Sequence, residues 1–280
     1  MWVLAAFVTM VGFGINNMIF KLTNGKGLSK VHMQFYFYLV AFILMGAIGV
    51  AGGLEPFNWL TVLLGASIGI LNANGNIQMS KAFEKGPASI TSPLISMNSI
   101  IPVLSAALLF HEHITLWQWI GIVIMLTSAI VIQYSPTKQA ITIEYKPWII
   151  RILLSLGSFG LLGVLMKTST HLTLDALNVL ICMYGGGAVY LLLNSLVQRE
   201  NWQRREFQFG ALIGCISVIS YSSYFFALQT GISSIVFPIV SLNSLVVVVL
   251  SCYYFKENLK HYQMAGIVTA LIGVVLTKIE

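Results

Sequence analysis

Ten long apolar stretches dominate the sequence and leave few folds open to it. Water is absent from the bilayer core, so a segment that crosses it must satisfy its own backbone hydrogen bonds, which about 20 apolar residues in an α-helix can do. The stretches cover residues 2–20, 34–53, 58–80, 88–110, 116–134, 148–167, 175–197, 208–228, 232–254 and 261–278. This pattern predicts an all-α membrane protein with ten transmembrane helices.

Charged residues are too scarce to cover a water-facing surface. They make up 9% of the chain, whereas an average globular domain has about 25%. A soluble enzyme is therefore excluded. The formal charge of +6 at pH 7 does not indicate a nucleic-acid partner, because Lys and Arg gather in the loops between the apolar stretches, as they do in membrane proteins. We expect the lipid bilayer to be the partner that surrounds the chain.

The cysteines and histidines form no metal-ligand pattern. Cys182, Cys215 and Cys252 lie within apolar stretches, and none has a second Cys or a His at the spacing of a metal site. An intramembrane enzyme would need a nucleophile with a base, or metal ligands, at matched depth. No predicted span contains an internal His or Asp. We therefore predict no metal, no cofactor and no catalytic residue.

The second half of the chain repeats the first. Residues 79–133 align with residues 224–278 without a gap, and the identities include residue types that a chance match of aliphatic stretches would not select. They pair Gly86 with Gly231, Pro93 with Pro238, Ser96 with Ser241, Asn98 with Asn243, Glu112 with Glu257, and the same shift pairs Gly65 and Gly69 with Gly210 and Gly214. We predict a first five-helix unit at 1–134, a linker at 135–147 and a second five-helix unit at 148–280.

An odd number of crossings per unit has a mechanical consequence. The second unit must enter the membrane from the opposite side, which makes the repeat an inverted one. Two units in opposite orientations can exchange conformations, and the exchange opens a shared central cavity to one side and then to the other. The repeat thus predicts transport by alternating access.

The distribution of Lys and Arg predicts on which side of the membrane the loops and termini lie. Most of the fifteen Lys and Arg residues lie in or beside the loops after the first, third, fifth, seventh and ninth spans. Because Lys and Arg are enriched in cytoplasmic loops, this distribution places those loops in the cytoplasm and both termini outside.

Neutral polar side chains occur within the predicted spans, where an unpaired polar group is costly. In the third span the i, i+4 spacing stacks Asn72 with Asn76 on one face and Asn74 with Gln78 on another. Hydrogen bonds between helices would explain each residue singly, but recurrence in both units favours a shared cavity. The predicted substrate contacts are Asn16, Asn72, Asn76, Ser96, Asn98, Ser158, Tyr221, Ser241 and Asn243.

Three prolines interrupt backbone hydrogen bonding within the predicted spans. Pro93 and Pro102 lie in the fourth span and Pro238 in the ninth. A proline inside a helix removes one backbone hydrogen bond and frees a carbonyl about one turn earlier. We assign these positions to gating or helix bending, while wedging between helices is the simpler alternative.

The acidic residues lie in loops or at span ends, and none lies near mid-membrane. Proton-coupled carriers usually need an intramembrane group that can change its protonation, so a facilitator or exchanger is favoured. Glu112 recurs as Glu257, and we interpret both as charges that stabilise the start of the following helix through its macrodipole. Thr115 and Gln118 have the spacing of a capping box for that helix.

Several motifs occur twice and together resemble the EamA-type permeases of the drug/metabolite transporter superfamily. They are Gly14 and Lys21 in the first span, Gly86 before the fourth, and Glu112 with Gln118-xx-Gly121, repeated as Glu257 with Gln263-xx-Gly266. Phe13 stands where the family usually has Trp, and Val247 where Pro102 has its repeat partner.

The resemblance implies ten helices in two inverted units, with a cavity built largely from the first, third, fourth, sixth, eighth and ninth spans. It also implies movement of amino acids, related metabolites or small amphipathic compounds. It places both termini in the cytoplasm, in conflict with the Lys and Arg distribution.

We predict a secondary transporter that moves a small polar, neutral or zwitterionic metabolite across the plasma membrane, as an exporter or exchanger. The small-molecule substrate is amino-acid-like. The alternative is an uptake facilitator for a sugar or a quaternary amine, and an aromatic cage for such an amine could draw on Tyr221, Tyr224, Phe225 and Phe226. The sequence allows a homodimer but does not require one.

Overall fold

All regular secondary structure is helical in the part of the chain that the computed structural model describes, which is residues 1–23, 26–134, 145–198, 202–255 and 260–277. The helices are α1 (Trp2–Thr23), α2 (Lys30–Gly52), α3 (Trp59–Lys85), α4 (Ala88–Ser96), η1 (Met97–Ser99), α5 (Ile100–Leu108), α6 (Leu116–Gln133), α7 (Tyr145–His171), α8 (Ala176–Gln198), α9 (Arg204–Thr230), α10 (Ser233–Ser241), α11 (Asn243–Phe255) and α12 (His261–Leu276). The predicted linker at 135–147 lies mostly outside the described residues.

The lengths and hydropathy of these helices suit a membrane. Among the described residues, nine helical segments are long and apolar enough to cross a bilayer, counting α4 to α5 and α10 to α11 as one segment each. The tenth predicted span, α12, is apolar but only 16 residues long within its described bounds. An all-α chain with many apolar spans is therefore confirmed, whereas the count of ten crossings stays a prediction.

Two of the predicted spans are interrupted rather than continuous. The fourth breaks at η1 (Met97–Ser99), and the ninth breaks at Leu242, between α10 and α11. At both breaks an asparagine side chain bonds a backbone carbonyl three residues earlier. Asn98 Nδ2 donates to the oxygen of Ile95 at 2.7 Å, and Asn243 Nδ2 donates to the oxygen of Val240 at 2.9 Å. Such bonds compete with the backbone hydrogen bonds of the helix. The hydropathy of the sequence does not reveal them.

The two halves of the chain interleave in a reciprocal way. α3 of the first half packs between α7 and α8 of the second, and α9 of the second half packs between α1 and α2 of the first. α2 also packs against α8, and α6 against α12. Each of these contacts has a counterpart when the two halves are exchanged, so the two halves pack against each other reciprocally.

Repeated glycines permit the closest of these contacts. A Cβ on Gly69 would lie 1.9 Å from the backbone oxygen of Met183 in α8, and a Cβ on Gly214 would lie 2.8 Å from that of Phe37 in α2. Gly65 and Gly210, one turn earlier, meet neighbouring backbone in the same way. The repeated glycines therefore bring α3 onto α8 and α9 onto α2, the close approach that small residues allow in membrane helices.

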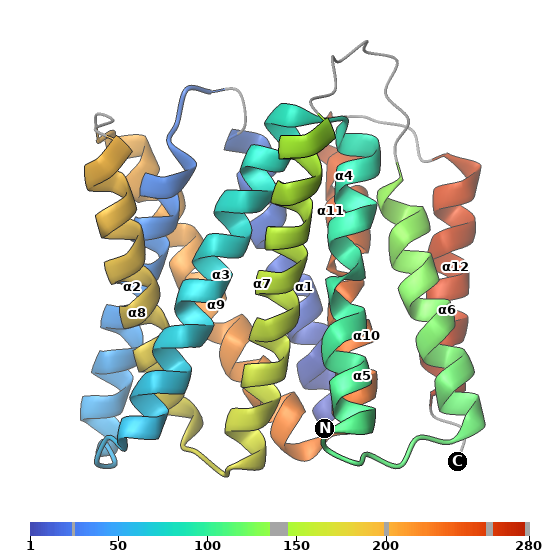
Figure 1. The fold of residues 1–280 in the computed structure, drawn as a ribbon, viewed down its shortest axis with the longest axis horizontal. Helices are drawn as coiled ribbons and strands as arrows, with labels where there is room; N and C mark the ends of the chain where they lie inside the picture. Colours follow the sequence, from blue (N-terminus) through green and yellow to red (C-terminus); the bar gives the residue numbers. More distant parts are fainter. Residues whose placement is uncertain (24–25, 135–144, 199–201, 256–259, 278–280) are drawn as a thin grey trace.

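The direction of the helices also differs between the halves. Figure 1 shows α1 running upward from the lower edge of the molecule and α7 running downward from the upper edge. We call the end where α1 finishes and α2 begins the upper end. The lower end is the one where α5 finishes and α6 begins.

Candidate functional site

A cavity of about 840 Å³, lined by both polar and apolar side chains, lies between the two halves. Every helix except α8 contributes to its described lining. The predicted contacts that line it are Asn16, Asn72, Asn76, Ser96, Asn98, Tyr221, Ser241 and Asn243. Ser158 is the one predicted contact outside this lining. The structure thus gathers residues from both repeats around one space.

Asn72 and Tyr221 join the halves across the cavity wall. Asn72 Nδ2 donates to the hydroxyl oxygen of Tyr221 at 2.7 Å, which links α3 to α9. Asn76 lies one turn further along α3, and its Nδ2 bonds the backbone oxygen of Asn72 at 3.0 Å. Asn72 and Tyr221 are both buried. Their mutual bond satisfies polar groups that would otherwise be costly in a membrane.

α1 supplies two neighbouring asparagines with different partners. Asn16 Nδ2 donates to Ser217 Oγ of α9 at 2.8 Å, while Asn17 Nδ2 donates to Asn243 Oδ1 of α11 at 3.2 Å. The remaining amide oxygen of Asn16 is buried without a hydrogen-bond partner among the described residues. α1 therefore holds both α9 and α11 at the cavity and still presents one unused acceptor.

The breaks in the fourth and ninth spans face the same cavity. Asn98 and Asn243, which bond the carbonyls at these breaks, both line it, as do Ser96 and Ser241. Ser96 Oγ donates to the backbone oxygen of Ser92 at 3.0 Å, and Ser241 Oγ donates to that of Pro238 at 2.7 Å. The donor groups of these repeated side chains therefore form hydrogen bonds with the backbone of their own span. Sequence spacing did not reveal these bonds.

The second polar face of α3 points away from the cavity. Asn74 Nδ2 donates to Ser158 Oγ of α7 at 2.9 Å, and Gln78 Nε2 donates to Asn74 Oδ1 at 3.0 Å. Arg151 Nη1 of α7 then donates to Gln78 Oε1 at 2.6 Å. Ser158 therefore takes part in a helix-to-helix network, and the two faces of α3 differ as their spacing suggests.

The prolines differ in their relation to the cavity. Pro102 lines it and is the third residue of α5, where its missing N–H removes no helical hydrogen bond. Pro93 and Pro238 lie inside α4 and α10 at matching positions. Neither lies at a break, since the breaks follow several residues later at η1 and Leu242. Their gating function stays a prediction.

Aromatic rings pack around Tyr221, the cavity residue that accepts from Asn72. The ring centroid of Phe13 lies 4.7 Å from that of Tyr221 and 5.9 Å from that of Tyr224. Tyr224 meets Phe237 of α10 edge to face at 6.2 Å. All four line the cavity. Phe225 and Phe226, named with them in the sequence, do not line it, and Phe226 is exposed on the outer surface.

The upper part of the lining contains two lysines that sequence reasoning did not assign to the site. Lys21 of α1 donates from Nζ to Ser251 Oγ of α11 at 2.9 Å. Lys30 is the first residue of α2 and also lines the cavity, with Gln34 one turn later. The second span is not among those that the family resemblance implied for the cavity. The one sequence feature that could have indicated its part in the lining is the i, i+4 spacing of Lys30 and Gln34, which places them on one helix face.

A carboxylate bridges the two halves at the lower end. Glu112, in the loop between α5 and α6, forms an ion pair with Lys167 of α7 and accepts hydrogen bonds from the backbone N–H groups of Ser233 and Ser234. Burial acts to raise the pKa of Glu112, but the bonds from Lys167 and Ser234 outweigh it and hold that pKa below its ordinary value.

Glu112 thus caps α10 of the other half, and the interpretation that it serves the following helix was wrong. α6 has its own cap: Thr115 and Gln118 form the predicted capping box. Glu257, the repeat partner of Glu112, lies outside the described residues. The partner of Glu112 is more than a hundred positions away in sequence, so local spacing could not identify it.

A second buried acid lies at the upper end. Glu206 Oε2 is 3.1 Å from His32 Nδ1, and both side chains are almost completely buried between α2 and α9. Glu206 also accepts from the backbone N–H groups of Ser29 and Gln203, and the indole of Trp202 stacks on the His32 ring at 3.9 Å. The sequence placed these groups at span ends but not in contact.

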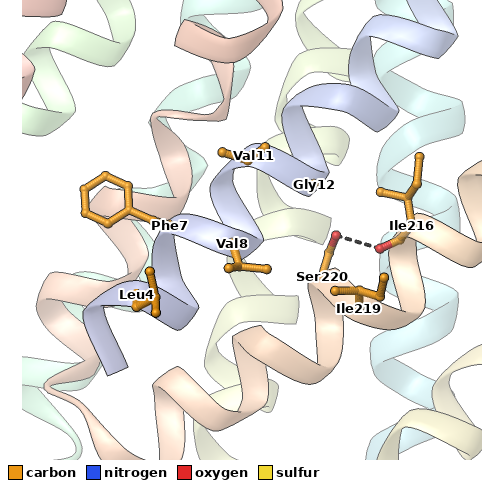
Figure 2. Close-up of a pocket in the computed structure, with 8 residues that line it drawn as sticks. All are labelled: Leu4, Phe7, Val8, Val11, Gly12, Ile216, Ile219 and Ser220. Atoms are coloured by element: carbon orange, nitrogen blue, oxygen red, sulfur yellow. Dashed lines mark hydrogen bonds between the residues drawn. The ribbon is translucent and has the colours of Figure 1, made fainter. Parts of the chain in front are cut away.

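A separate hollow lies on the outer side of α1 and α9 (Figure 2) and has a volume of about 420 Å³. Its lining is apolar apart from Ser220, whose hydroxyl donates to the backbone oxygen of Ile216 at 2.8 Å. Gly12 lets α1 approach Ser220 here. Without free polar groups in its lining, this hollow is a poorer candidate for a polar solute than the central cavity.

These features define the class of protein. An apolar chain of many membrane-length helices, whose two similar halves enclose a cavity, is a multi-pass membrane protein. The family model of the EamA-like transporter family matches residues 1–134 and 146–279. The chain belongs to this family of membrane transporters.

A solved structure supports the fold without naming a function. A protein known from a crystal structure superposes with a TM-score of 0.83 and 13% sequence identity, over 98% of this chain and 95% of the other. At that identity the likeness concerns the fold alone. A comparison with curated proteins found no match.

Proposed function

We propose that this protein is a secondary transporter that moves a small polar, neutral or zwitterionic, amino-acid-like metabolite across the plasma membrane, as an exporter or exchanger. The observation that carries the proposal is the central cavity, whose middle is lined by amides and hydroxyls from both repeats. Neutral donors and acceptors suit a solute that is polar but carries little net charge.

Alternating access is the proposed mechanism, and it needs two inverted five-helix units with ten crossings. The reciprocal packing of the halves supports this arrangement, as do the opposite directions of α1 and α7 in Figure 1. In the proposal α12 is the tenth crossing and 135–147 the linker. Exchange of conformations between the units moves access from one end of the cavity to the other.

The two ends of the cavity differ as the mechanism requires. The lining extends at the upper end to Lys21 and Lys30. At the lower end Glu112 ties α7 and α10 together, and the rings of Phe13 and Phe237 lie between this tie and the asparagines. These contacts support a conformation whose cavity communicates with the upper end.

An uptake facilitator for a quaternary amine or a sugar is the second candidate. The rings of Phe13, Tyr221, Tyr224 and Phe237 line one part of the cavity, and aromatic faces attract quaternary ammonium groups. Stacking against such rings also suits a sugar ring. The two candidates differ in the solute that binds, so one screen separates them.

Counterflow into proteoliposomes tests the function. Vesicles loaded with an unlabelled amino acid should take up the same labelled amino acid faster than empty vesicles, and the uptake should saturate. Labelled choline and glucose test the second candidate in the same vesicles. Protein-dependent flux that neither saturates nor responds to internal solute would indicate a pore and overturn the proposal.

Asn76→Leu and Asn194→Leu form a matched pair for this assay. Each asparagine donates from Nδ2 to the backbone oxygen four residues earlier, at 3.0 Å for Asn76 and 2.9 Å for Asn194. Only Asn76 lines the cavity. Counterflow should fall with Asn76→Leu and persist with Asn194→Leu; equal effects of the two substitutions would remove Asn76 from the site.

A further inference from the structure

One face of α2 enters the cavity, although the family resemblance did not implicate this helix. Lys30, Gln34 and Phe37 follow one another at intervals of four and three residues, which places them on one helix face, and all three line the cavity. Lys30 is half-buried, whereas Gln34 is only 3% exposed. α2 therefore places a cation and an amide one turn apart at the upper end of the site.

The charge of Lys30 has little local compensation. In the part of the chain that the structure describes, no carboxylate lies within ion-pair distance of its ammonium group. The charge that acts on it is that of Glu84, an exposed residue in the last turn of α3. A half-buried ammonium that has no ion-pair partner among the described residues is stabilised when an anionic group binds beside it.

Three oxygens in the same lining lack a hydrogen-bond donor. They are Gln34 Oε1, Asn16 Oδ1 and Ser244 Oγ, each buried and without a partner among the described residues. The two amide oxygens can only accept hydrogen bonds. A buried acceptor without a donor is unfavourable, so a solute that carries N–H or O–H groups would favour side-chain rotamers that turn these oxygens toward it.

We propose that Lys30 and Gln34 determine the substrate class: the cavity selects solutes with a carboxylate next to a hydrogen-bond donor, that is, α-amino or α-hydroxy acids. Lys30 binds the carboxylate, and the amide oxygens of Gln34 and Asn16 accept from the ammonium or hydroxyl group. This inference rests on the proposed transport function. It narrows the zwitterionic solutes to α-amino acids and adds the α-hydroxy acids, whose negative charge Lys30 would balance. It assigns the discrimination to a helix outside those that the family resemblance implies.

Probes that share a side chain and differ in one group test the selection. Thermal shift and counterflow are measured with leucine, leucinamide, 2-hydroxy-4-methylpentanoate and 4-methylpentanoate, and with the corresponding phenylalanine and serine series. In at least one series the amino acid and the hydroxy acid should bind about tenfold more tightly than the amide, which lacks the carboxylate. They should also bind about tenfold more tightly than the plain acid, which lacks the donor. Each factor is that expected for one charge-assisted bond. Equal binding of the amide, or no binding by any acid, would overturn the proposal.

Substitutions in α2 then test whether Lys30 and Gln34 cause the preference for acids. Lys30→Gln should weaken binding of the acids about tenfold and leave the amide unchanged, while Lys30→Arg should keep the preference for acids. Lys26→Gln is the matched control, because Lys26 is an exposed lysine near the start of α2 outside the cavity lining. Gln34→Glu keeps an acceptor but adds a negative charge, so it should shift the preference toward leucinamide.

The two proposals fail in different ways. If sugars or amines show counterflow and Lys30→Gln leaves it unchanged, transport stands and the acid selection is wrong. If no solute in either panel shows saturable, protein-dependent counterflow, the transport function itself is wrong. If Lys30→Gln and Lys26→Gln weaken acid binding equally, Lys30 has no specific part in it, and the assignment is rejected.

Discussion

Glu112 and Lys167 form an ion pair across the two halves of the molecule, with 2.8 Å between Oε1 and Nζ. The same carboxylate accepts from the first two backbone N–H groups of α10 and from the hydroxyl of Ser234. Three elements that are distant in sequence thus meet at one side chain. In a carrier whose halves move relative to each other, such a tie must break whenever the lower end opens.

Loss of this tie should destabilise the described conformation. Glu112→Ala leaves the mostly buried ammonium of Lys167 and the N–H groups of α10 unpaired, which should cost about 1–3 kcal/mol in free energy of unfolding. A double-mutant cycle with Glu112→Gln and Lys167→Met, read by thermal unfolding in detergent, measures the coupling. Additive effects of the two substitutions would show that the ion pair contributes no coupling energy.

The stabilisation by Glu112 should depend on pH in a defined direction. Because its pKa in the folded protein lies below the ordinary value of 4.5, its charge stabilises the fold at pH values above 4.5, and this contribution is lost as the pH falls through the depressed pKa. The difference in melting temperature between the wild type and Glu112→Gln should therefore shrink on acidification. A difference that grows below pH 4.5 would contradict the assignment.

Tyr221→Phe should weaken the link between α3 and α9. The substitution removes the oxygen that accepts from Asn72 at 2.7 Å and leaves a buried amide donor unpaired, at a cost of about 1–3 kcal/mol. Both the melting temperature and the counterflow rate should fall. Tyr253→Phe is the control, since Tyr253 is exposed on α11 and loses a hydroxyl without this effect.

Asn98→Leu and Asn243→Leu should abolish flux, and each should also lower stability. Each amide bonds a carbonyl at a helix break, so its removal leaves a backbone acceptor unpaired beside the cavity, worth about 1 kcal/mol. Thermal unfolding and counterflow measured on the same preparations separate the two effects. Unchanged flux with either substitution would remove that asparagine from the transport path.

Gly69→Ala and Gly46→Ala should behave in opposite ways. A Cβ at Gly69 would meet the Met183 backbone, whereas a Cβ at Gly46 has nothing within 4 Å. Gly46→Ala should be neutral or stabilise α2 by about 0.5–1 kcal/mol, as for alanine in a helix interior. Gly69→Ala should lower the melting temperature, because it forces α3 away from α8. Similar melting temperatures for the two variants would rule out close packing at Gly69.

Hydropathy and the internal repeat predicted much of this molecule. The apolar stretches correspond to helices because the bilayer leaves a spanning backbone no other partner. Polar residues inside them, such as Asn72 and Tyr221, line the cavity because a membrane chain places such groups in its interior. The capping box of Thr115 and Gln118 was predictable because all its atoms lie within one turn.

What the sequence did not reveal depends on contacts between distant elements. The helix breaks at η1 and Leu242 coincide with hydrogen bonds from asparagine side chains to backbone carbonyls. A hydropathy profile, which averages over many residues, cannot detect such bonds. The hydrogen bond that Ser234 donates to Glu112 joins residues from different halves, and so does the pairing of His32 with Glu206. Lys30 lies ahead of the predicted second span at 34–53, and only the packing of α2 brings its side of the helix to the cavity.

The asparagines at the two helix breaks also bear on any attempt to redesign this carrier for a new cargo. Their amide donors are already engaged by their own main chain, so altering them damages the scaffold before it changes recognition. Among the described residues, Lys30 and Gln34 of α2 make no such bond to the main chain, whereas Phe37 packs in the core against Tyr38 and Tyr184. A directed-evolution library would do best to hold the two asparagines and Phe37 constant and randomise Lys30 and Gln34 together.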